Sequence, residues 1–159
     1  MENSFITMRC QEYYGKVLST NKDLKTSACT AAGRPHPHVQ KIIKNIPIEV
    51  REKFYGCGAP LPLGIEGLRV LDLGSGSGRD SYAAAALVGE KGSVTGIDMT
   101  AEQLKVARQH AERYCKEILG YSKPNLQFVE GSKRTLSAGV LSLIRLICSM
   151  FVRVYRTSG

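Results

Sequence analysis

A glycine-rich loop near the middle of the chain carries the residues whose types and spacing could do chemistry. The pattern D-x-G-x-G-x-G runs from Asp72 to Gly78, directly after a short apolar run. Glycine has no Cβ, so the backbone of such a loop can come close to a ligand. A second carboxylate, Asp98, follows 20 residues after Gly78, at the distance where an acid accepts the hydroxyls of a ribose. This spacing predicts a site for a ligand that contains a nucleoside.

The loop departs from the dinucleotide pattern at one position, which bears on the identity of the ligand. The pattern G-x-G-x-x-G needs a third glycine where this chain has Arg79. The carboxylate of Asp72 would also repel a pyrophosphate at close range. S-adenosylmethionine carries no phosphate, and an acid at Asp72 suits its cationic methionine end. We therefore expect S-adenosylmethionine as the cofactor. A dehydrogenase is the disfavoured reading, and a further alternative is that the glycines only form a tight turn while Asp98 caps a helix.

The elements that must position this loop alternate regularly. Apolar runs predict strands at 68–73, 93–98 and 126–131. A small-residue helix is expected over 81–89, and a second helix over 100–118. Thr100 and Gln103 have the spacing of a capping box for this second helix. The order predicts an α/β fold with a parallel βαβαβ half of a doubly wound sheet, which binds ligands at the carboxyl ends of its strands.

Residues 1–64 are predicted to form a separate region of helices and loops. A short helix or helix end is expected at 8–18, and a breaker cluster, GRPHPH, follows at 33–38. A helix is then expected from Val39, and Pro47 suits the first turn of another helix that runs to Tyr55. The apolar positions that share one face of the first of these helices are Val39, Ile42, Ile43 and Ile46.

Composition and charge exclude several classes of protein. The chain of 159 residues has a net charge of +8, but aromatic residues do not alternate with Lys and Arg, so nucleic-acid binding is not expected. The amino terminus lacks an apolar stretch of the secretory type, which favours the cytosol. Five cysteines without a C-x-x-C pair argue against both a disulfide framework and a zinc ribbon. His36 and His38 have no Cys or acid partner nearby in sequence, and we expect both in an exposed loop.

Several motifs together resemble those of arsenic(III) methyltransferases. They are YYGKVL from Tyr13, DLKTSAC ending at Cys29, FYGCGAPLP at 54–62, VLDLGSGSGRD at 70–80 and LVGEKGSVTGIDMT at 87–100. The glycine loop alone is typical of methyltransferases in general, whereas YGCG ahead of it is typical of this family. The resemblance covers about residues 10–131. It implies a Rossmann-like class I methyltransferase fold and transfer of a methyl group from S-adenosylmethionine to trivalent arsenic held by cysteine thiolates, with a thiol reductant.

The resemblance also implies roles for individual residues. Cys29 and Cys57 match family cysteines that deliver the substrate or take part in the disulfide step, so they are the expected catalytic residues and arsenic ligands. Cys115 matches no family motif, and its place on an apolar helical stripe predicts a core position. The expected cofactor-binding residues are Tyr55, Asp72, Gly74, Ser75, Gly76, Gly78, Asp98 and Met99.

The family pattern stops after Gly131, and the last segment differs in composition. Residues 132–159 contain no acid, whereas the preceding 131 residues contain all 14. We expect three regions, 1–64, 65–131 and 132–159, in a product truncated after its cofactor-binding half and with little or no activity. The alternatives are a non-catalytic binder of the cofactor or of As(III), and a small-molecule methyltransferase with another substrate.

The apolar stretches of the last segment are too short to span a bilayer, because Arg145 and Arg153 interrupt them. A poorly defined tail is expected there. A helix lying on a membrane or packing over the open sheet is the alternative, and exposure of a free sheet edge is a risk.

Overall fold

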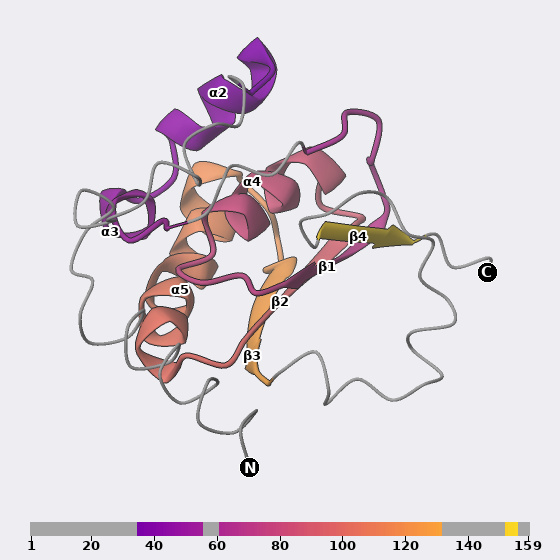
Figure 1. Ribbon diagram of the computed structural model, residues 1–159. Helices are drawn as coiled ribbons and strands as arrows, with labels where there is room; N and C mark the ends of the chain where they lie inside the picture. Colours follow the sequence, from indigo (N-terminus) through magenta and orange to yellow (C-terminus); the bar gives the residue numbers. More distant parts are fainter. Residues whose placement is uncertain (1–34, 56–60, 132–151, 156–159) are drawn as a thin grey trace.

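A four-stranded sheet with helices forms the centre of the molecule (Figure 1). The computed structural model describes residues 35–55, 61–131 and 152–155. The three predicted strands are present as β1 (Arg69–Leu73), β2 (Ser93–Asp98) and β3 (Leu126–Glu130). They pair in parallel, with Leu73 opposite Ile97 and Asp98 opposite Glu130. Their carboxyl ends therefore lie at one edge of the sheet, which confirms the predicted βαβαβ half.

Two helices between these strands build the main core. They are α4 (Arg79–Val88) and α5 (Ala101–Arg113), and a π-helical turn, η4 (Tyr114–Ile118), continues α5. Small residues let α4 pack closely, and Ala83, Ala84 and Ala85 have no exposed surface. These helices share one hydrophobic cluster with Val70, Val94 and Phe128 of the strands. Leu71 and Leu73 point to the other face of the sheet, as the alternation of side chains along a strand requires.

The predicted capping box at the start of α5 does not form. Thr100 is the N-cap residue, but its side chain makes no capping hydrogen bond. The carboxylate of Asp98 accepts a hydrogen bond from the Thr100 N–H at 2.8 Å instead. In a capping box the side chain of Gln103 would accept this N–H, so the acid two residues before Thr100 takes the place of Gln103.

The amino-terminal part of the described chain contains two short helices, α2 (Pro37–Lys44) and α3 (Ile48–Glu52). The first begins two residues before the expected start at Val39, because proline suits the first turn of a helix. His36 and His38 are exposed, as expected, but His38 lies within α2 and His36 is its N-cap, not part of a loop. The His36 imidazole accepts the His38 N–H at 3.2 Å. The second helix ends at Glu52 rather than Tyr55. The helix expected at 8–18 lies outside the described residues.

A fourth strand corrects the expectation of a poorly defined tail at residues 152–155, and the other residues of that tail lie outside the described ranges. β4 (Val152–Tyr155) pairs antiparallel with β1, so the sheet order is β3-β2-β1-β4. Its sequence VRVY is rich in residues that favour strands, and the outer edge of β1 offers unpaired backbone groups. On the β1 side, the sheet edge is therefore covered by β4, whereas a free edge was named as a risk for the half-sheet (Figure 1). Within the described ranges, no helix has the length and apolar character needed to cross a membrane.

Candidate functional site

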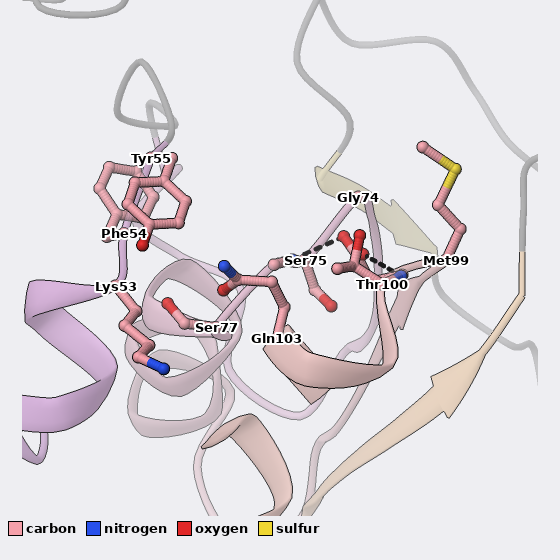
Figure 2. A pocket seen from close by; sticks show the side chains of 11 residues that line it. Lys53, Phe54, Tyr55, Gly74, Ser75, Ser77, Met99, Thr100 and Gln103 are labelled. Carbon is pink, nitrogen blue, oxygen red and sulfur yellow. Dashed lines mark hydrogen bonds between the residues drawn. The ribbon is translucent and has the colours of Figure 1, made fainter. Parts of the chain in front are cut away.

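A cavity of about 260 Å³ opens at the carboxyl ends of β1 and β2 (Figure 2). Three segments line it: residues 53–55 after α3, residues 74–77 of the glycine-rich loop, and residues 98–100 with Gln103 at the start of α5. Its volume is near the lower end of the roughly 300–1,000 Å³ that is usual for small-molecule sites. The position is the one where doubly wound sheets bind ligands.

The glycine-rich loop turns sharply over the end of β2. The N–H groups of Gly74 and Ser75 both donate to the carbonyl of Ile97, at 2.7 and 3.0 Å. Gly74 and Gly76 have φ angles of 83° and 55°, in the left-handed region that glycine adopts without steric cost. The loop therefore presents bare backbone to the cavity, as its sequence predicts.

Asp98 is held in a fixed orientation by backbone donors from two segments. One carboxylate oxygen accepts the Gly76 N–H at 2.9 Å, and the other accepts the Thr100 N–H at 2.8 Å. Each carboxylate oxygen has a further lone pair. The arrangement presents an immobilised acceptor to the cavity, and it can take the hydroxyls of a ligand.

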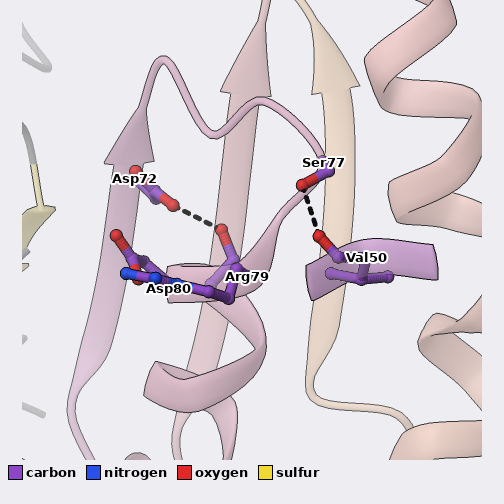
Figure 3. A network of polar contacts seen from close by, with 6 residues as sticks. Val50, Asp72, Ser77, Arg79 and Asp80 are labelled. Atoms are coloured by element: carbon purple, nitrogen blue, oxygen red, sulfur yellow. Dashed lines mark hydrogen bonds and ion pairs between the residues drawn. The ribbon is translucent and has the colours of Figure 1, made fainter. Parts of the chain in front are cut away.

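Asp72 does not line the cavity, although it was expected to bind the cofactor. It lies on the same face of β1 as Val70, beneath α4, where Ser81 donates a hydrogen bond to its carboxylate at 2.5 Å (Figure 3). The pKa of Asp72 is raised to about 7, mainly because the carboxyl group is buried; the Ser81 hydrogen bond lowers the pKa in part, and the nearby charges of Asp80 and Asp98 add to the rise. The alternation along the strand explains this position.

Gly78 also lies away from the cavity lining. It has a φ of 91° and is the N-cap of α4. A Cβ at this position would lie 2.5 Å from the ring of Phe128. Gly78 therefore allows close packing of the loop on β3. Of the expected cofactor-binding residues, the structure brings six to the cavity: Tyr55, Gly74, Ser75, Gly76, Asp98 and Met99.

Sequence reasoning missed several residues that line or support the cavity. Lys53, Phe54, Ser77, Thr100 and Gln103 line it. The Ser77 hydroxyl donates to the carbonyl of Val50 at 2.8 Å, which joins the loop to α3 (Figure 3). Ser77 lies inside the quoted glycine motif and could have been found there. Phe54 opens the quoted FYGCGAPLP motif and could also have been found there. Lys53 carries no local signal, because its role depends on where α3 packs.

The guanidinium of Arg79 lies 3.2 Å from the centre of the Phe54 ring. It also forms an ion pair with Asp80 at 2.8 Å. Arg79 stands where the dinucleotide pattern would have a third glycine, and here it supports an aromatic residue of the cavity wall.

The cysteines with family context lie outside the described residues, so the structure places neither Cys29 nor Cys57. Cys115 is buried in η4, as predicted, and its thiol donates to the Asn125 side chain at 3.4 Å. Burial raises the pKa of this thiol. In the described part of the chain, no group of three or more His, Cys, Asp or Glu residues is placed to hold a metal ion.

The known proteins that are similar in sequence to this chain are methyltransferases. Residues 65–136 match a family described as a methyltransferase domain. The chain is 45% identical over 134 residues to an arsenite methyltransferase of Mus musculus, covering 83% of this chain and 35% of that protein. It is 49% identical over 121 residues to an arsenite methyltransferase of Aquipseudomonas alcaligenes, covering 76% and 34% of the two chains.

One solved structure that is similar to this chain has the same named activity as these relatives. It is an arsenic(III) S-adenosylmethionine methyltransferase from Chlamydomonas reinhardtii, with 60% identity and a TM-score of 0.60 over 63% of this chain and 33% of the other. The chain spans about a third of the length of the relatives it matches. This protein is therefore a homologue of the arsenite methyltransferases and contains a methyltransferase domain.

Proposed function

We propose that the cavity binds S-adenosylmethionine and that the protein acts in the methylation of trivalent arsenic bound by thiols. One observation carries the first part: the carboxylate of Asp98 is fixed by two backbone donors beside a glycine-rich loop, in a cavity at the strand ends. The identity of the chain to proteins named arsenite methyltransferase supports the second part.

The residues present fit this cofactor better than a dinucleotide. Asp98 can accept hydrogen bonds from ribose hydroxyls. Gly74 and Gly76 have no Cβ, so the loop leaves room for the ligand beside its backbone. The loop also lacks the third glycine of the dinucleotide pattern, because Arg79 stands at that position. Tyr55 and Met99 add apolar surface to the lining. Bound here, S-adenosylmethionine supplies a methyl group on a sulfonium, which the lone pair of a soft arsenic(III) centre can attack.

The substrate side of the proposal rests on the two cysteines that match the family. Cys29 and Cys57 deliver trivalent arsenic or its thiol conjugate, because thiolates are preferred ligands of soft centres. A thiol reductant keeps these groups reduced, and a reducing compartment such as the cytosol suits them. We expect little turnover from this chain alone, since two such thiolates are too few to hold arsenic in line with the methyl donor.

Calorimetric titration of the whole chain with S-adenosylhomocysteine tests the cofactor site, with circular dichroism to establish folding. Wild type should bind saturably, and Asp98→Ala should bind at least about ten-fold more weakly, because it loses charge-assisted hydrogen bonds. Glu130→Ala is the matched control. This exposed acid ends the neighbouring strand opposite Asp98 but does not line the cavity. A folded chain that does not bind S-adenosylhomocysteine would contradict the proposal, and tight binding of NADH would support a dehydrogenase instead.

An assay of arsenite-dependent demethylation of S-adenosylmethionine tests the substrate. Slow turnover that disappears in a Cys29→Ser, Cys57→Ser double variant is expected. Fast turnover would contradict the expectation of low activity. Retention of As(III) by wild type without any turnover would favour a non-catalytic binder, and turnover with another acceptor would favour a different methyltransferase.

A further inference from the structure

Two charged side chains line the cavity, and they lie on different sides of it. Within the described lining, these are Lys53 and Asp98. Figure 2 shows Lys53 and Tyr55 together on one side, with Met99, which directly follows Asp98, on the other. A ligand that spans the cavity therefore meets a cation on one side and an anion on the other.

The Asp98 side of the cavity cannot receive a second anion. Both oxygens of Asp98 accept backbone hydrogen bonds, which hold its negative charge in place. A ligand carboxylate near this group would be repelled. Hydroxyl groups, in contrast, can donate to it. Hydroxyl groups of a ligand therefore belong on the Asp98 side of the cavity. A carboxylate of the same ligand belongs on the other side.

Lys53 has the properties of an anion-binding group. It lies directly after α3 and is half-buried. Among the described residues, no carboxylate lies within ion-pair distance of its ammonium group. Removing an ammonium group from water without a counter-ion is unfavourable, so an anionic ligand group would offset this cost. The aliphatic part of the side chain can meanwhile pack against the cavity wall.

We propose that Lys53 binds the carboxylate of the amino-acid part of the ligand. This inference rests on the proposed function, and it assigns the orientation of the ligand: the ribose at Asp98 and the amino-acid carboxylate at Lys53. It also makes Lys53 a determinant of specificity. A nucleoside thioether without an amino-acid carboxylate loses the contact with Lys53 and keeps the one with Asp98.

The test compares two ligands that differ in this carboxylate. Wild type, Lys53→Gln and Lys53→Arg, each as the whole chain, are titrated with S-adenosylhomocysteine and with methylthioadenosine, which lacks the amino-acid group. Lys53→Gln should weaken binding of S-adenosylhomocysteine by about ten-fold to a hundred-fold and leave methylthioadenosine within about two-fold. Lys53→Arg should keep most of the affinity, because it retains the charge. Lys91→Gln is the matched control, since Lys91 is an exposed lysine that precedes the amino end of β2.

Each other outcome overturns the inference in a recognisable way. If Lys53→Gln weakens both ligands equally, Lys53 supports the cavity wall and does not bind the carboxylate. If it changes neither, another group binds the carboxylate. If folded wild type binds neither ligand, the proposed cofactor site fails and this inference fails with it. Binding of S-adenosylhomocysteine by wild type therefore separates a failure of the Lys53 assignment from a failure of the proposed function.

Discussion

The carboxyl group of Asp72 makes the stability of the fold depend on pH. Burial raises its pKa from an ordinary value of 3.8 to about 7. Between these two values the folded state holds a proton that the unfolded state has released. The folded state is therefore stabilised below about pH 4, and this contribution is lost as the pH rises through about 7.

We expect Asp72→Asn to remove this pH dependence, because the amide keeps the shape of the carboxyl group and has no charge to desolvate. The free energy of unfolding, measured in urea across this pH range, should fall with rising pH in wild type. The difference between variant and wild type should grow by at most about 1.4 kcal/mol per pH unit. Glu66→Gln, at an exposed acid, is the control. Parallel pH curves for wild type and Asp72→Asn would contradict the assignment.

Gly78 combines a left-handed backbone with a close approach, and a second glycine separates the two effects. Gly78→Ala places a Cβ 2.5 Å from Phe128 and also strains a φ of 91°. Gly89→Ala strains a φ of 70° but meets no atom within 4 Å. We expect a loss of about 1–2 kcal/mol for Gly89→Ala and about 2–4 kcal/mol for Gly78→Ala in urea unfolding. Equal losses of stability in the two variants would show that the Phe128 ring moves aside without a cost in free energy.

At the scale of elements, the contact between Arg79 and Phe54 joins the start of α4 to the segment after α3. The guanidinium lies 3.2 Å from the ring centre, and the Arg79 side chain is only 17% exposed. A cation over an aromatic ring in partly desolvated surroundings contributes about 1–2 kcal/mol. This contact supports the wall of the cavity formed by residues 53–55.

A double-mutant cycle measures this contact. Arg79→Gln and Phe54→Leu should each destabilise the fold, and together they should show a coupling of about 1 kcal/mol in urea unfolding. The affinity for S-adenosylhomocysteine should fall several-fold in both single variants, since each loosens the same wall. A coupling near zero would show that the two side chains act independently. Arg113→Gln, at an exposed helix position, is the control for loss of charge.

The distribution of apolar residues and glycines predicted the helices and strands better than it predicted how they pack against one another. The strands at 93–98 and 126–130 and the end of α4 at Gly89 follow from apolar runs and a terminal glycine. The place of Asp72 under α4 follows from the alternation of side chains along β1, which puts Asp72 on the same face as Val70. Lys53 could not be predicted, because nothing local in the sequence says that α3 ends beside the cavity. β4 was missed because its partner strand is distant in the chain.

At the scale of the whole molecule, β4 completes the outer side of β1. The pairing runs from Arg69 opposite Tyr155 to Asp72 opposite Val152. Without it, the backbone groups of β1 on that side would face solvent, which is a known route to association between chains. The last strand thus protects the strand that leads into the glycine-rich loop.

Deletion of residues 152–159 tests this role. We expect amide hydrogen exchange at residues 69–72 to become at least about ten-fold faster, with a smaller change in β2 and β3. Deletion of residues 156–159, which spares β4, is the matched control and should leave exchange unchanged. Unchanged exchange in the longer deletion would contradict the observed sheet order.

The same pairing sets an order of events in folding. β1 finds β2 across a short connection that α4 fills, and β2 finds β3 in the same way, whereas the partners in β1 and β4 are about 80 positions apart. Closing a longer loop costs more chain entropy, and distant pairings slow folding. The three parallel strands should therefore form first and β4 should join last. During that interval at high protein concentration, β4 of one molecule can add to β1 of another, so slow refolding in dilute solution is expected to give the higher yield of monomer.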